Sequence, residues 1–197
     1  MSSGSLVRYG GGSEPYFYQQ PIEFIRIVQN TAPILLNPIQ IGTLPTMRLG
    51  RKISLKHLQI GIQWHVDPAH YQSNYKWAIV YDRQCNGVAP TNADVWAVAS
   101  ASSHRNMVNI HRFKVIKEET RHIAPAQTSV GNTTAPTIRT EKNNFISLKG
   151  YETLFNTSSG TIGDIVSGSL WLMMISDQTS ATNAIGITGH IHLSFIP

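Results

Sequence analysis

The chain has 197 residues, a length that favours one domain. Only 14% of the residues are charged and 41% are hydrophobic, so the composition excludes an intrinsically disordered chain. The net charge of +5 permits an acidic partner such as nucleic acid, the single cysteine excludes an internal disulfide, and no apolar run is long enough for a transmembrane helix.

The first twenty residues are rich in glycine and serine and carry an aromatic patch at 16–18. They predict a mobile arm over 1–20, followed by a single domain over 21–197; an unimportant tail is the alternative interpretation. The first expected strand is Glu23–Gln29. Residues 32–50 hold three prolines and show little periodicity, which indicates an extended connection.

The segment from Arg51 to Val66 alternates between apolar and polar residues with one phase slip. Ile53 and Leu55 share one face, and the apolar set resumes at Leu58 after two polar residues. A one-residue slip in a period-two pattern predicts a strand with a β-bulge at that point.

Six more strands follow, and an uninterrupted apolar run near the end of the chain predicts one buried on both faces. The expected strands are Tyr75–Asp82, Ile110–Lys117, Arg121–Ile123 after a break at 118–119, Asn144–Lys149, the apolar run Leu170–Ile175, and Ile185–Phe195. Thr91 to Asp94 resembles a capping box, with aspartate in place of glutamate, and predicts one short helix. Long polar connections are expected at 67–74, 100–108, 124–143 and 156–168. The pattern favours an all-β sandwich or jelly roll.

Catalytic signatures are absent from the sequence, which contains no GxGxxG, GxxxxGK[ST], HExxH or GxSxG motif. His190 and His192 could ligate a metal from one strand face, but no carboxylate accompanies them locally. A jelly-roll enzyme of cupin type would need them to converge with His65 and Glu152, which no spacing supports. Cys85 is interpreted as a buried or incidental thiol. The sequence therefore predicts no enzyme, no cofactor and no metal.

Three segments, taken in order, resemble the single-jelly-roll coat proteins of small circular single-stranded DNA viruses and of satellite-necrosis-type plant viruses. Residues 48–62 are similar to an "R-x-G-x-K-I" strand, and residues 109–116 resemble an "RFKVL" strand. Residues 78–94 closely resemble a "YDRQxNGxAPT" segment. Its residues here are Tyr81, Asp82, Arg83, Gln84, Asn86, Gly87, Pro90 and Thr91.

The resemblance implies an eight-stranded jelly roll of two packed four-stranded antiparallel sheets, with one short helix in a loop. It implies a capsid protein that assembles with itself into an icosahedral T=1 shell of roughly 60 copies around a single-stranded genome. DNA is favoured over RNA because the wording of the middle motif is closer to the DNA viruses. The implied localisation is the virion, with passage through the host nucleus during assembly and a host-cell receptor as further expectations, and no membrane partner.

A basic arm of the kind common in this family is not evident, since the first 25 residues hold only Arg8 as a basic residue. Either such an arm is missing from this chain, or the inner wall of the shell binds the genome, or little genome is packaged. Phosphate contacts from basic residues on the inward side would be nonspecific and salt-sensitive. The candidates are Arg8, Arg26, Arg48, Arg51, Lys52 and Lys56.

The alternative function is a jelly-roll carbohydrate- or receptor-binding module that acts as a monomer or small oligomer. Exposed aromatic rings would then stack on sugars, and Tyr71, Tyr75 and Trp96 are the candidates. Whether Asp82 and Arg83 pair within one subunit or across an interface is open at this point.

Overall fold

The computed structural model describes residues 15–66, 73–123, 138–181 and 184–197. Within these ranges the chain forms ten β-strands, one short α-helix and one turn of 3-10 helix. They are β1 (Tyr16–Arg26), β2 (Ile34–Leu35), β3 (Lys52–Val66), β4 (Ser73–Asp82), α1 (Asn92–Val95), η1 (Met107–Asn109), β5 (Phe113–Ile123), β6 (Ile138–Ser147), β7 (Glu152–Phe155), β8 (Ile165–Ser167), β9 (Ser169–Ser176) and β10 (Gly186–Ile196).

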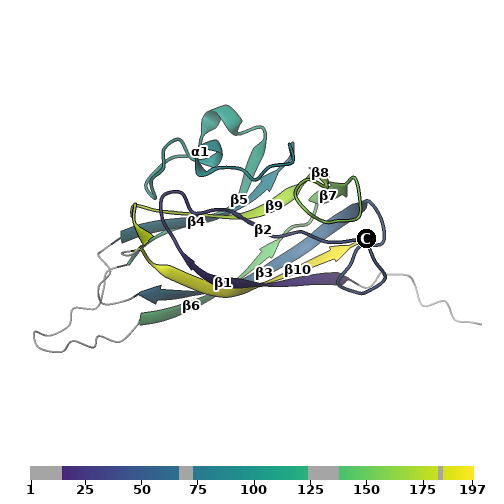
Figure 1. Cartoon of the computed structure of the whole chain (residues 1–197), viewed down its shortest axis with the longest axis horizontal. Coiled ribbons are helices and arrows are strands. Elements are labelled where there is room, and N and C mark those ends of the chain that lie inside the picture. The colour runs from purple at the N-terminus through teal and green to yellow at the C-terminus, as the bar shows by residue number, and fades with distance from the viewer. Residues whose placement is uncertain (1–14, 67–72, 124–137, 182–183) are drawn as a thin grey trace, which may run out of the picture.

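The strands form two antiparallel sheets that pack face to face (Figure 1). One sheet has six strands in the order β1-β10-β3-β7-β8, with β6 also paired to β3. The other has four strands in the order β2-β9-β4-β5. The last strand therefore lies between the first and third, and β9 lies between the second and fourth. This interleaving of early and late strands is the double Greek-key order of a jelly roll, so the predicted fold class is confirmed.

The structure has ten strands where a jelly roll has eight, because two of the eight strands are each divided into two shorter ones. β6 and β7 pair with successive parts of β3. β8 and β9 follow each other directly and are divided by Gly168, where the chain passes from one sheet to the other. Gly168 has φ +80°, and a Cβ there would lie 2.0 Å from the carbonyl oxygen of Glu152, so only glycine fits this crossing.

The bulge predicted in the long third strand is confirmed. His57 pairs with Ser194 whereas Leu55 pairs with Phe195, so Lys56 is the extra residue. The apolar residues on both sides of the bulge consequently face the same core. That core also receives inward side chains from β1, β4, β9 and β10. The largest residues of the whole core include Trp64, Trp77 and Phe195.

Several predicted boundaries differ from the structure. β1 begins at Tyr16, inside the segment expected to be an arm, whose residues 1–14 lie outside the described residues. Its alternation is hidden because Gln20 occupies an inward position and Pro21 interrupts the run, which an edge strand tolerates. β5 is continuous through 118–119, where a break was expected, and the short strands β2, β7 and β8 were not predicted.

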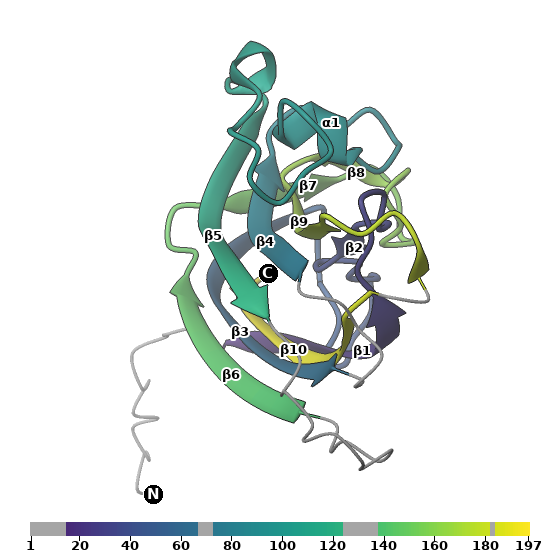
Figure 2. The same cartoon turned by 90° about the vertical axis from the view of Figure 1, so that its left-hand side faces the viewer.

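An ion cluster joins the two sheets along the edge where β5 and β6 lie beside each other (Figure 2). Glu119 of β5 accepts hydrogen bonds from Arg121 and from Lys142 of β6, at 2.5 and 2.6 Å. Burial alone would raise the pKa of Glu119, but these two cations outweigh it and lower that pKa. The Arg121 guanidinium also lies 4.8 Å from the ring of Trp64, so the cluster covers this side of the core.

The outer faces of the two sheets differ. The connection between β4 and β5, residues 83–112, folds over the four-stranded sheet and carries α1, as the upper layer of Figure 1 shows. We call the outer face of that sheet the covered face. A second apolar cluster fills it, and all eight residues of β9 are buried, as the apolar run predicted. Among the described residues, no segment lies over the outer face of the six-stranded sheet (Figure 1). No helix of the described part is long and apolar enough to span a membrane.

Candidate assembly motif and nucleic-acid surface

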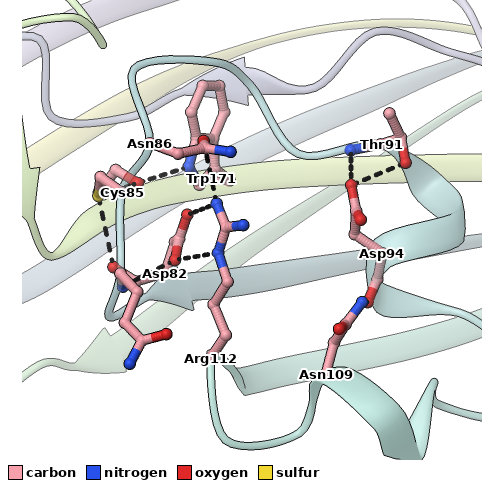
Figure 3. Close-up of polar contacts among 10 residues, drawn as sticks. Asp82, Cys85, Asn86, Thr91, Asp94, Asn109, Arg112 and Trp171 are labelled. Carbon is pink, nitrogen blue, oxygen red and sulfur yellow. Dashed lines mark hydrogen bonds and ion pairs between the residues drawn. The ribbon is translucent and has the colours of Figure 1, made fainter.

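Asp82, at the end of β4, is the centre of the motif that the sequence singled out (Figure 3). Its carboxylate is fully buried and accepts two hydrogen bonds from Arg112, at 3.0 and 2.8 Å, and a third from the backbone of Gln84 at 2.9 Å. The hydrogen bond to Asp82 raises the pKa of Arg112. Arg112 also donates to the side chain of Asn86 at 3.2 Å. The ion pair thus ties both ends of the 83–112 connection to each other.

Asp82 therefore forms its ion pair within the subunit, and its partner is Arg112 and not Arg83. Arg83 is exposed and makes a single long side-chain contact, 3.4 Å from the carbonyl oxygen of His111. Tyr81 points to the other side of β4, where its hydroxyl donates to the carbonyl oxygen of Glu152 at 2.5 Å. The signal for Arg112 was present in the sequence as a basic residue just before the third matching segment, but spacing alone did not identify the pair.

The rest of the motif forms the turn into α1. Gly87 has φ +81°, and Pro90 is buried before the helix starts. The carboxylate of Asp94 accepts hydrogen bonds from the backbone N–H and the hydroxyl of Thr91, at 2.7 and 2.8 Å (Figure 3). The predicted capping interaction is confirmed, with aspartate serving the role more common for glutamate. Asn109 of η1 donates to the carbonyl oxygen of Asp94 at 3.0 Å, which fixes η1 against α1.

Cys85 lies half-buried beside this motif. Its thiol is 3.1 Å from the hydroxyl of Ser169, which also accepts a hydrogen bond from the indole of Trp171. Burial raises the pKa of the Cys85 thiol, so it stays protonated and is a poor nucleophile at neutral pH. This agrees with the interpretation of Cys85 as a packed thiol.

The covered face is closed by a buried tryptophan and a buried lysine. Trp96, immediately after α1, is 0% exposed, and its indole donates to Glu118 at 2.9 Å. Lys76 of β4 donates to the carbonyl oxygen of Ser103 at 2.6 Å and lies 3.6 Å from Glu118. Burial would raise the pKa of Glu118, but the hydrogen bond from Trp96 and the neighbouring cations outweigh it and lower that pKa. These contacts hold the connection on the sheet at the end opposite Asp82.

Several aliphatic side chains of this fixed connection are exposed to solvent. Val108 of η1 is 86% exposed, and Met107 beside it is 69% exposed. The other exposed aliphatic residues of the connection are Val88, Val98 and Ile110. We call these five residues the apolar rim. It overlaps residues 100–108, which the sequence predicts to be part of a long surface connection.

Arg48 was predicted to contact nucleic acid, and the structure places it in the interior instead. Its side chain is 0% exposed and forms an ion pair of 3.0 Å with Asp164, which is equally buried. Its other donors reach the carbonyl oxygens of Ile39, Gly50 and Thr157, and its guanidinium lies 4.0 Å from the ring of Phe155. With every donor group occupied, Arg48 holds the loops at this end of the sandwich together and cannot reach an external phosphate.

The other predicted basic residues lie at the two ends of the six-stranded sheet. Arg51 is exposed, Lys52 forms an exposed ion pair of 2.8 Å with Glu152, and Lys56 is the half-exposed bulge residue. Arg26, at the opposite end of the sheet, donates to the carbonyl oxygen of Ala184 at 2.9 Å and lies 5.5 Å from the ring of Phe24. Arg8 lies outside the described residues. Their contact with nucleic acid stays a prediction.

The residues of the alternative functions are not arranged for them. Tyr75 and Trp96, the proposed sugar-stacking rings, are both 0% exposed, and Tyr71 lies outside the described residues. His190 and Glu152 do not converge, because His190 pairs with Gly61 of β3 whereas Glu152 pairs with Ser54, seven residues away along that strand. Across the described part of the chain, no three residues of the His, Cys, Asp or Glu type lie together as metal ligands would.

Comparisons with known proteins give weak likenesses. No protein-family model and no curated protein matches this chain. A solved structure from desmodium yellow mottle tymovirus is similar at 18% identity, over 98% of this chain and 95% of that one, with a TM-score of 0.35. The VP2 subviral particle of infectious bursal disease virus is similar at 12% identity, over 92% of this chain and 33% of that one, with a TM-score of 0.32. At these scores the fold assignment rests on the strand order alone.

Proposed function

We propose that this protein is a viral coat protein that assembles with copies of itself into a closed shell around single-stranded nucleic acid. The observation that carries the proposal is the apolar rim, a set of exposed aliphatic side chains on a connection that ion pairs fix to the sandwich. Val108 is its most exposed member, at 86%.

Large aliphatic side chains that stay exposed on a fixed connection favour a surface that a partner covers, because covering them removes apolar area from water. The rim is held in advance of binding. Asp82 and Arg112 close the base of the connection, and Asn109 fixes η1 to α1. A surface ordered before association loses little conformational entropy when a partner docks, which favours a repeated, rigid contact between subunits. A closed shell repeats one such contact around its symmetry axes.

The finer features of the proposal come from the sequence resemblance. It supports a T=1 shell of roughly 60 subunits, a DNA genome rather than RNA, and a place in the virion. A host-cell receptor and a nuclear stage of assembly belong to the same set of expectations. A carbohydrate-binding module finds less support, because two of its three candidate rings, Tyr75 and Trp96, are buried.

Assembly is tested by size-exclusion chromatography of the purified chain, with absorbance recorded at nucleic-acid and protein wavelengths, followed by electron microscopy. For roughly 60 subunits of 21.8 kDa we expect a peak with about 1.3 MDa of protein and the mass of the packaged nucleic acid in addition. Val108→Asp should leave a folded subunit and abolish the particles, because a charge would be buried without a partner at the contact.

The matched control is Val108→Thr, which keeps the size of the side chain without adding charge and should still form particles. A chain that stays at 22 kDa under all salt and pH conditions, with or without added nucleic acid, would overturn the proposal. Particles formed equally well by the aspartate variant would remove the apolar rim from the subunit contacts.

A further inference from the structure

Four of the eight histidines lie on the outer face of the six-stranded sheet, which the described chain leaves uncovered. Every second residue of β3 from Leu58 to Trp64 faces the core, so the residues that alternate with them face outward. Two of the outward residues, His57 and His65, mark the ends of this stretch, about 26 Å apart along the strand. On the neighbouring β10, His192 pairs with Gln59 and His190 pairs with Gly61. We call this surface of β1, β10, β3 and β6 the histidine face.

Each histidine of this face has a defined contact there. His57 stacks on Phe145 of β6 with ring centroids 4.9 Å apart, and His192 meets Phe17 of β1 edge-on at 5.6 Å. His65 meets Phe24 of β1 at 5.7 Å. These three phenylalanines remain exposed, Phe145 by 70%, so their rings can still accept a further stacking partner.

Two glycines make room for the remaining rings. A Cβ on Gly61 would lie 2.3 Å from Cε1 of His190, so the imidazole lies across this glycine. In the same way a Cβ on Gly186 would lie 2.3 Å from the ring of Phe24. His190 and His192 also line a shallow hollow together with Gln19, Pro21 and Gln59. The face therefore offers aromatic rings, imidazoles and amides in one place.

Fixed negative charge is nearly absent from this surface. The two central strands, β3 and β10, contain no aspartate or glutamate. β1 contributes Glu23 and Arg26, and β6 places Glu141 and Arg139 opposite Gln63 and His65 in the register. Lys52 and Lys56 lie beyond the His57 end, where Glu152 forms an ion pair with Lys52. Since histidine changes charge between pH 5 and 8, acidification turns the centre of the face positive with no carboxylate on the central strands to cancel it.

We propose that the histidine face binds single-stranded nucleic acid, with phenylalanine rings stacking on bases and protonated histidines contacting phosphates, so that binding tightens as the pH falls. The inference rests on the proposed function for its ligand and adds the surface and its pH control. Stacking on aromatic rings combined with positive charge is how proteins hold single strands without sequence preference.

A second copy of the chain fits this surface less well than a nucleic acid does. The exposed apolar side chains on the four strands of the face are aromatic and are separated by glutamine and histidine, whereas the apolar rim is aliphatic. Protonation of four histidines on each of two facing copies would repel them at acidic pH, whereas it would attract a polyanion.

The test measures the affinity of the purified full-length chain for a short fluorescein-labelled oligo-dT, and for oligo-rU, by fluorescence anisotropy near pH 5.5 and near pH 7.5. We expect wild-type binding to be about tenfold tighter at the lower pH, the effect of one pKa unit gained by a histidine on phosphate contact. His190→Gln with His192→Gln should lose most of this gain. The matched control, His104→Gln with His111→Gln, removes two exposed histidines of the 83–112 connection and should keep it.

Phe145→Ala separates stacking from charge, and should weaken binding about tenfold at both pH values while the acid gain remains. If the chain is isolated only as sealed shells, the oligonucleotide is added during reassembly and counted per subunit by absorbance. Unchanged acid gain in the double variant, with folding verified by circular dichroism, overturns the inference. Particle formation is scored separately, so shells that form without any acid gain refute the histidine face while leaving the coat-protein proposal intact.

Discussion

The two outer faces of the sandwich share a pattern of alternating residues, but one face is covered by the chain and the other is not. On the covered face, the outward residues of β4 are Lys76, Ala78, Val80 and Asp82, and all four are buried beneath the 83–112 connection. On the histidine face, the outward residues of β3 are histidine, glutamine and glycine, and the described chain leaves them without a cover. The subunit itself thus buries one face, whereas the side chains of the other face are accessible to a partner.

The difference lies in how charge is treated. The covered face contains fixed charges, and each is neutralised in place, Asp82 by Arg112 and Lys76 by Glu118. Such pairs specify one position for the connection, because leaving either charge buried alone would be costly. The central strands of the histidine face contain no carboxylates, so their histidines keep a variable charge for an external polyanion. The strand pattern is shared, and the pairing of charges decides which face is structural.

The largest expected effect comes from removing the aromatic anchor of the covered face. Trp96→Ala should lower the free energy of unfolding by about 4 kcal/mol, because it empties a fully buried site and removes the indole bond to Glu118. Phe145→Ala, the same kind of truncation on the histidine face, should cost less than about 1 kcal/mol because Phe145 is 70% exposed. Urea unfolding of both variants measures the contrast. Equal losses would mean that the two faces do not differ in the way described.

A smaller effect is expected from the ion pair at the base of the connection. Asp82→Asn should lower the free energy of unfolding by about 2 kcal/mol, since Arg112 loses its counter-charge but is itself a quarter exposed. Arg83→Ala, the adjacent motif residue, should change it by no more than about 0.5 kcal/mol because Arg83 is exposed. Thermal unfolding and particle formation are measured together. Full stability and normal particles in the asparagine variant would show that the aspartate is dispensable.

Much of the fold could be predicted from the sequence because period-two alternation records which face of a strand is buried. The bulge at Lys56, the buried run in β9 and the aspartate cap of α1 all follow from such local patterns. The short strands were missed for the converse reason. β2 has two residues and β7 has four, too few to show a period.

The candidate site was less predictable because charged residues are ambiguous in a sequence. Arg48 is a basic residue in a polar segment, as a surface phosphate contact would be. Its burial depends on an ion pair with Asp164, which lies far away in the chain. Lys76 and Asp82 alternate with apolar residues as solvent-facing positions would, and only the fold of the 83–112 connection covers them. The histidine face needed the register of two strands, since His57 and His65 come from β3 and the other two histidines from β10.

Gly61, the residue beneath the His190 ring, is expected to matter more for binding than for stability. Gly61→Ala would place a Cβ 2.3 Å from His190 and 2.7 Å from the side-chain oxygen of Asn143. Both neighbours are side-chain atoms that can rotate away, and alanine is favoured over glycine within a strand, so the free energy of unfolding should change by less than about 1 kcal/mol. The imidazole must nevertheless leave its position across the sheet. We therefore expect the tighter binding of oligo-dT at acidic pH to shrink severalfold while stability is kept.

Gly163→Ala is the matched control, because the nearest atom to its Cβ would be the hydroxyl of Thr161 at 3.9 Å. It should alter neither the unfolding curve nor the acid gain. If Gly61→Ala also left the acid gain unchanged, the position of His190 over the glycine would have no part in binding. If it unfolded the chain instead, the close packing at Gly61 would serve the sheet itself, and the distinction between a structural face and a binding face would fail at the centre of the histidine face.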